Sequence, residues 1–297
     1  MIYYVSLDIC SIETYSIHMD IYRYRKLVTS VLDTVTILGT RGSIPSVGSE
    51  YARFGGNTTC VLVNLCGEFI VLDAGTGLMD CPVPDDDRRR NIKLLLSHPH
   101  ADHLAGLPLS PLMMHRGVHI DFYSKSRAGL DAKAQVLRLV SPPLWPISVD
   151  ALPADIDFHE LPDRMELGGV TVEVMEGCHP GGVSIIKLSG HGHSVVFIPD
   201  CTLTDELMPK LIDFARECSL LLCDGQYSDE EWLQRSNFGH SSWSKTAQLG
   251  EACEARRVRI IHHDPKHTDD ILLEASLQLI AHHPNCSFAT AREEIIL

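Results

Sequence analysis

The sequence is short of positive charge. Its 297 residues include 25 Lys and Arg against 39 Asp and Glu, which gives a formal net charge of −14 at pH 7. Non-specific affinity for nucleic acids comes mainly from Lys and Arg side chains that displace counterions. We therefore expect no extended nucleic-acid-binding surface, whereas a small anionic substrate held by metal ions is compatible with this composition.

The sequence also lacks the features of an exported or membrane-bound chain. No basic segment opens the chain, and Asp8 and Glu13 interrupt its first apolar residues, so we reject a signal peptide and a membrane span. The 10 cysteines include no C-x-x-C pair. This pattern favours reduced thiols in a cytoplasmic protein.

Apolar residues are plentiful by contrast, at 44% of the chain, which is enough for a large core. Residues 1–33 carry no motif, and we treat them as an N-terminal extension of unknown role. From Thr34 onward, short apolar strands alternate with glycine-rich turns. The turn at residues 39–43 lacks the P-loop ending and the G-x-G-x-x-G spacing, so we expect a structural turn at the rim of the site.

The densest chemical signal is LLLSHPHADHLAG, residues 94–106. The apolar run is typical of a buried strand, and His98 and His100 follow its end two positions apart, so both can chelate one cation. Asp102 and His103 come next, at the expected start of a helix, where a second cation can be held. Imidazole suits zinc and its first-row neighbours, and a carboxylate adds the negative charge that a water-activating site needs.

This stretch resembles the H-x-H-x-D-H signature of the metallo-β-lactamase-fold hydrolases. Within that superfamily the chain is most similar to the ribonuclease Z-like branch, in particular to small cyclic-nucleotide phosphodiesterases, including the phage anti-Pycsar type. The resemblance runs from Thr34 to the C-terminus. It implies a hydrolase domain over residues 34–297 with an α/β fold, the four-layer αββα sandwich.

The resemblance also implies two metal ions, which we expect to be Zn²⁺, with Mn²⁺ as the alternative. Its implied ligands are His98, His100 and His179 on one metal, Asp102, His103 and His262 on the other, and Asp200 between them. His263 is the competing choice for the last histidine, because neighbours in an extended chain face opposite sides.

Further residues receive roles around these ligands. Asp102 counts as catalytic, and His240, in the Gly-His-Ser turn, is the candidate general acid, although this turn can also be a simple helix cap. Asp73 either orients a metal-bound histidine or caps a turn. The remaining assignments are Trp145 and Ser241 as substrate-binding residues, and His263 and Asp264 as residues that support the metal ligands without binding the metal. Core packing of Trp145 is an equal alternative.

The leading functional hypothesis is hydrolysis of 3′,5′-cyclic nucleotides to nucleoside monophosphates. The alternatives are a ribonuclease Z-like RNA 3′-processing endonuclease and a metal-dependent hydrolase of small esters or lactones. As partners we expect a small anionic nucleotide substrate and a second copy of the chain in a homodimer.

Overall fold

The computed structural model describes residues 32–85 and 90–297. The predicted N-terminal extension, residues 1–33, therefore lies almost wholly outside the described residues, and the domain boundary at residue 34 stays a prediction. The first described strand does begin at Thr34.

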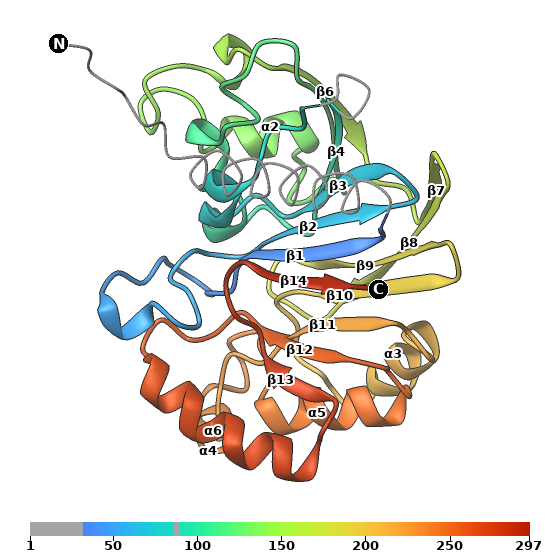
Figure 1. The fold of residues 1–297 in the computed structure, drawn as a ribbon. Helices are drawn as coiled ribbons and strands as arrows, with labels where there is room; N and C mark the ends of the chain where they lie inside the picture. The colour runs from blue at the N-terminus through green and yellow to red at the C-terminus, as the bar shows by residue number, and fades with distance from the viewer. Residues whose placement is uncertain (1–31, 86–89) are drawn as a thin grey trace, which may run out of the picture.

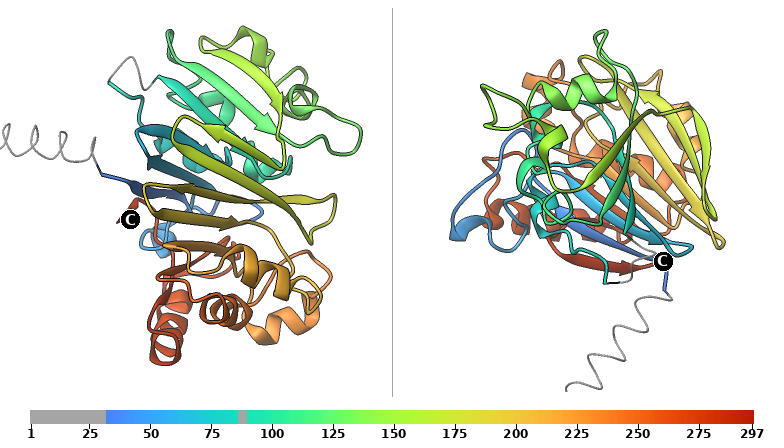
Figure 2. Two further views of the ribbon diagram at one scale, coloured as in Figure 1. Left: turned by 90° about the vertical axis from the view of Figure 1, so that its right-hand side faces the viewer. Right: turned by 90° about the horizontal axis from the view of Figure 1, so that it is seen from above.

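Two seven-stranded sheets pack face to face with helices on their outer sides (Figures 1 and 2). The first sheet has the order β14-β1-β2-β3-β4-β5-β6. Its strands are β1 (Thr34–Gly39), β2 (Cys60–Leu65), β3 (Glu68–Leu72), β4 (Asn91–Leu96), β5 (His119–Ser124), β6 (Asp155–Glu160) and β14 (Glu293–Ile296). The expected four-layer αββα sandwich is confirmed.

The second sheet has the order β13-β12-β11-β10-β9-β8-β7. Its strands are β7 (Arg164–Leu167), β8 (Val170–Gly177), β9 (Val183–Gly190), β10 (His193–Ile198), β11 (Leu220–Asp224), β12 (Val258–Ile261) and β13 (Cys286–Phe288).

Helices cover both outer faces. Helix α2 (Ala132–Leu137) lies on the side of the first sheet, and four helices lie on the side of the second (Figure 1). These four are α3 (Met208–Phe214), α4 (Asp229–Arg235), α5 (Trp243–Ala252) and α6 (Asp269–His282). Short 3₁₀ turns complete the fold: η1 (Ser49–Tyr51), η2 (Thr76–Asp80), η4 (Ala101–His103), η5 (Leu107–Leu109) and η6 (Val149–Ala151). No helix within residues 32–85 and 90–297 is long and apolar enough to cross a membrane.

The core has three apolar layers, because each sheet is buried on both faces. Val63, Leu95 and Phe197 belong to the layer between the sheets and are fully buried. Each such side chain stabilises the fold by about 1.5–3 kcal/mol relative to an exposed position. This double burial explains why apolar runs rather than alternating patterns mark the central strands.

The parallel strands bring the site together. Strands β3 to β6 are parallel to one another, and so are β10 to β13. The carboxyl ends of parallel strands lie at one edge of a sheet, where ligands characteristically bind. The chain leaves β4, β10 and β12 at this edge directly into the segments that carry His98, Asp200 and His262.

Two expected helices are shorter than the sequence suggests. The helix expected at Asp102 is only the turn η4, because the His103 carbonyl accepts a bond from the Ala74 amide, at 2.8 Å, instead of continuing a helix. The spacing of apolar residues over 203–217 also predicts a helix, but α3 starts only at Met208, because the Leu203 amide is held by the Ser241 hydroxyl at 2.8 Å.

Candidate metal centre

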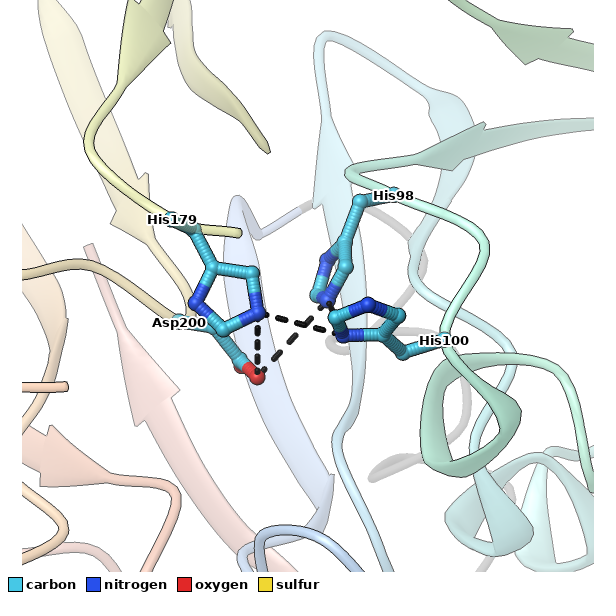
Figure 3. A group of neighbouring side chains, drawn as sticks. All are labelled: His98, His100, His179 and Asp200. Atoms are coloured by element: carbon cyan, nitrogen blue, oxygen red, sulfur yellow. Dashed lines mark hydrogen bonds and ion pairs between the residues drawn. The ribbon is translucent and has the colours of Figure 1, made fainter. Parts of the chain in front are cut away.

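The first group of ligand-type atoms comes from both sheets (Figure 3). His98 and His100 follow β4, His179 follows β8, and Asp200 follows β10. The Nδ1 atom of His100 lies 2.9 Å from Nε2 of His98 and 3.1 Å from Nε2 of His179. Oδ2 of Asp200 lies 3.7 Å from His98 Nε2 and 3.8 Å from His179 Nε2.

The second group shares Asp200 with the first. Nε2 of His103 and Nε2 of His262 each lie 3.0 Å from Oδ1 of Asp200. Oδ2 of Asp102 lies 3.3 Å from Nε2 of His103 and 3.2 Å from Nε2 of His262. All four side chains are buried. One carboxylate thus offers an oxygen to each group.

The spacing of these atoms fits metal coordination. Ligands of a tetrahedral zinc ion at 2.0–2.1 Å lie about 3.3 Å from one another, and the separations here run from 2.9 to 3.8 Å. His103 Nε2 and Asp200 Oδ1 are buried and have no hydrogen-bond partner among the described residues. Unsatisfied buried polar atoms are costly, and a cation between them would satisfy both.

Hydrogen bonds behind the imidazoles fix which nitrogen faces inward. His179 donates from Nδ1 to the Gly239 carbonyl at 2.9 Å, and His103 donates from Nδ1 to Oδ2 of Asp73 at 2.6 Å. Because Nδ1 is engaged in this way, each ring turns Nε2 into the cluster, as metal ligation requires. Asp73 lies in the orienting position considered from the sequence, and it also accepts bonds from Ser97.

Burial and charge act differently on the two groups. Burial lowers the pKa values of His98, His100 and His179, which favours neutral rings with free lone pairs. Burial alone would also lower the pKa values of His103 and His262. Nearby carboxylates, led by Asp200, outweigh it, holding the pKa of His103 well above its ordinary value and raising that of His262 to about 10. The carboxylates of the second group therefore favour a positive charge between them, carried either by protonated histidines or by a bound cation.

His240 borders the metal ligands and has a partner of its own. Its Nδ1 lies 2.9 Å from Oδ2 of Asp224, and its ring stacks on that of His262 with centroids 4.9 Å apart. Asp224 is fully buried and also accepts bonds from the amides of Cys201 and Gln226. Asp224 is not among the site residues predicted from the sequence, although its place at the end of the buried strand β11 is a usable signal.

The turn at residues 39–43 supports the second group more directly than the sequence suggested. The Ser43 amide donates to Oδ2 of Asp102 at 2.8 Å. A Cβ atom on Gly42 would lie 2.3 Å from the His262 ring, so only glycine fits. Gln226, also missed from the sequence, places Oε1 3.2 Å from His262 Nδ1 and donates to the Ser43 hydroxyl.

The structure places His263 and Asp264 away from the ligands. His262 has a positive φ of 63°, and this kink after β12 points the two histidines to different sides. His263 donates from Nε2 to the Ala289 carbonyl at 2.9 Å, and burial, with the nearby Arg41 charge, lowers its pKa to about 3. The Asp264 carboxylate accepts from the Lys266 amide. Neither side chain takes the supporting place assigned from the sequence.

The two proposed substrate contacts also differ from expectation. Ser241 is fully buried, and its hydroxyl donates to the Cys201 carbonyl at 2.7 Å while accepting from Leu203. It ties two loops together and has no exposed atom for a substrate, whereas Ser242 caps α5. Trp145 packs against the core on the outer side of the first sheet, which is the packing alternative.

A family model for the beta-lactamase superfamily domain matches residues 69–263, more than half of the chain. Ribonuclease Z of Bacillus subtilis is 25% identical over 117 residues, which cover 39% of this chain and 37% of that enzyme. Ribonuclease Z of Natronomonas pharaonis is 20% identical over 283 residues, covering 80% of this chain and 88% of that enzyme.

Solved structures show the same fold at low identity. The metallo-beta-lactamase fold protein YhfI from Bacillus subtilis superposes with a TM-score of 0.66 at 16% identity, covering 89% of this chain and 99% of that one. A diphosphatase from the PhnP family superposes with a TM-score of 0.62 at 18% identity, covering 89% of this chain and 98% of that one. At these identities the likeness concerns the fold alone.

Proposed function

This chain belongs to the beta-lactamase superfamily, and on that premise we propose that it is a dinuclear-metal phosphodiesterase acting on 3′,5′-cyclic nucleotides. The observation that carries the proposal is the pair of donor groups joined through Asp200, with the buried Asp224–His240 pair beside them. Two adjacent cations suit a phosphodiester, whose attacking and leaving oxygens both need charge stabilisation.

The proposed ligands divide as the geometry groups them. His98, His100 and His179 would hold one cation and Asp102, His103 and His262 the other, with one oxygen of Asp200 for each. Cations held by these residues would lower the pKa of a bound water far enough to give hydroxide near neutral pH, and would polarise the phosphoryl group. The histidine-rich donor sets suit Zn²⁺, and Mn²⁺ is the alternative.

His240 supplies the proton in this proposal. Because Nδ1 donates to Asp224, a proton on Nε2 is the one that can be given to a leaving oxygen. The Asp224 carboxylate accepts the Nδ1 proton and fixes the plane of the ring. Hydrolysis of a cyclic nucleotide expels a ribose alkoxide, which requires such a proton.

An RNA 3′-processing endonuclease is the second candidate, and the ribonuclease Z relatives that cover most of this chain favour it. Against it stands the net charge of −14, which disfavours a long polyanion. Hydrolysis of small esters or lactones is the third candidate, and it would use the same metal pair.

Substrate assays separate these candidates. We expect the purified protein with added zinc or manganese to open cyclic mononucleotides at least about 100-fold faster than Asp102→Ala, which lacks a ligand of the second group. Precursor tRNA, bis-para-nitrophenyl phosphate and an acyl-lactone complete the panel. Cleavage of precursor tRNA at its 3′ side, without turnover of any cyclic nucleotide, would transfer the assignment to the endonuclease.

We extend the proposal to a homodimer in the cytoplasm with a small anionic nucleotide as its ligand. The free state of all 9 cysteines in the described ranges supports a reducing compartment. Light scattering of the purified protein tests the dimer.

A further inference from the structure

A groove of about 540 Å³ lies at the edge of the second sheet, where α6 runs beside β13 (Figure 1). Its walls include Arg256, Arg257 and Arg259 together with Ile280 and Pro284. His262, at the candidate metal centre, follows the opposite end of β12, whose 4 residues span about 13 Å. The groove is therefore separate from the metal centre.

Positive charge in this groove is only partly neutralised. Arg259 pairs with Glu293, with Nε 2.7 Å from Oε1. The side chains of Arg256 and Arg257 make no hydrogen bond or ion pair with any described residue, and no acidic residue in the described ranges lines the groove. Burial, and then the neighbouring Arg259 and Arg256, lower the pKa of Arg257, while the charge of Glu293 acts in the opposite direction. Two unpaired guanidinium groups thus face one concave surface of an otherwise acidic protein.

The backbone that carries these arginines is held in place. The Arg256 amide donates to the Cys218 carbonyl, and the Arg257 carbonyl accepts from the Leu221 amide, each at 2.9 Å. A site whose backbone is already ordered loses less entropy when it binds a ligand. The arginines are therefore presented together on a preorganised turn.

The opposite wall is apolar. Ile280, at the end of α6, is 48% exposed, and Pro284 follows in the loop to β13. A ligand that fits both walls carries an anionic group at one end and an apolar or planar group at the other. The volume lies within the range of small-molecule sites, about 300–1,000 Å³.

We propose that this groove binds a phosphate monoester, with the phosphate on Arg256 and Arg257 and the organic group against Ile280 and Pro284. Guanidinium groups match phosphate oxygens with paired, charge-assisted hydrogen bonds. A monoester near neutral pH carries a charge of about −1.5 to −2, which balances the two unpaired arginines.

Calorimetric titration of the full chain with AMP tests the proposal. The metal centre can also hold a phosphate, so the readout is the binding event lost in the double variant Arg256→Ala/Arg257→Ala. We expect this event to weaken at least tenfold, and AMP to slow hydrogen exchange in residues 256–259 and 280–287. Arg216→Ala is the matched control, because Arg216 is exposed and pairs with Asp213 outside the groove.

Each comparison has an outcome that overturns the proposal. Identical AMP titrations for the wild-type chain and a double variant with unchanged thermal midpoint would remove the site. Inorganic phosphate should bind at least tenfold more weakly than AMP, and equal affinity would contradict contact with the apolar wall. If a 20-nucleotide RNA slows hydrogen exchange in these segments and AMP does not, the groove binds a nucleic acid and the small-ligand proposal is wrong.

Discussion

At the scale of single residues, the acid role proposed for His240, which pairs with Asp224, can be tested directly. His240→Ala removes the proton donor but none of the ligands, so we expect both metals and near-native substrate affinity to remain. Hydrolysis of a cyclic nucleotide should slow by about 10²–10⁴, the usual contribution of a general acid. Steady-state kinetics together with metal analysis of the same preparation check this.

The leaving group provides the internal control. A para-nitrophenolate departs without a proton, so bis-para-nitrophenyl phosphate should be hydrolysed by His240→Ala with a much smaller loss. Equal losses on both substrates, or a loss of metal, would falsify the acid role and return His240 to structural support.

The adjacent histidines 262 and 263 give a second residue-scale test. His262→Ala should lose one metal, because its Nε2 atom lies 3.0 Å from Asp200. His263→Ala should keep both metals but destabilise the protein by about 1–3 kcal/mol, since its buried ring packs edge-on against Phe54 and Phe288. Elemental analysis and denaturant titration separate the two effects, and the reverse pattern of metal loss would move the ligand role to His263.

At the scale of elements, an ion pair braces the loop that carries His179. Arg127, after β5, makes two hydrogen bonds to Glu176 of β8, at 2.6 and 3.1 Å, and a third to the Ser184 hydroxyl. Glu176 also accepts from the Val183 amide on the far side of the loop. The Arg127 side chain is only 8% exposed and that of Glu176 is 51% exposed, so the arginine half of the pair is shielded from water.

We therefore expect Glu176→Gln to lower the affinity for one of the two metals by about 10–100-fold, which is the effect of losing a partner that positions a ligand. The other metal should be retained. Glu173→Gln is the matched control, because Glu173 lies on the same strand but pairs with the exposed Arg164, away from the loop. Competition with a chromogenic chelator measures the metal affinity of both sites. Equal affinities in Glu176→Gln and Glu173→Gln would contradict the bracing role.

Central elements could be predicted from the sequence, whereas peripheral ones could not. Strands β1 and β12, which read TVTILG and VRII, can be recognised in the sequence because both are mainly apolar runs between clear turns. Strand β6 reads DIDFHE, and its acidic residues conceal its place at the sheet edge. Strand β13 has only 3 residues, too few for a periodic pattern.

The same contrast holds within the site. Histidines at strand ends are visible in a sequence, but their hydrogen-bond partners come from distant segments. Gln226 contacts His262 across a separation of 36 residues, which no local pattern encodes. Ser241 looked available because serine is usually exposed, yet contacts with Cys201 and Leu203 bury it.

At the scale of the whole molecule, the candidate ligands belong to both sheets, so bound metals would link the two halves of the sandwich. We expect close to two equivalents of transition metal per chain after gentle purification. Removing them with a chelator should lower the thermal midpoint, because each ligand at 100 times its Kd stabilises the folded state by about 2.7 kcal/mol. Elemental analysis and calorimetry measure both quantities.

The same chelator, saturated beforehand with Zn²⁺, serves as the control and should change neither value. A stoichiometry below one that added metal does not raise would contradict the dinuclear assignment.

The last strand of the chain pairs with the first described one, since β14 lies beside β1 with Ile296 opposite Thr34. During synthesis at about 5–20 residues per second, β1 must wait roughly 13 to 52 s for this neighbour to leave the ribosome. Until then one edge of the first sheet is open, and an open edge readily pairs with other chains. Translation that stops between His262 and Glu293 would release a polypeptide that contains every candidate ligand yet is prone to aggregate.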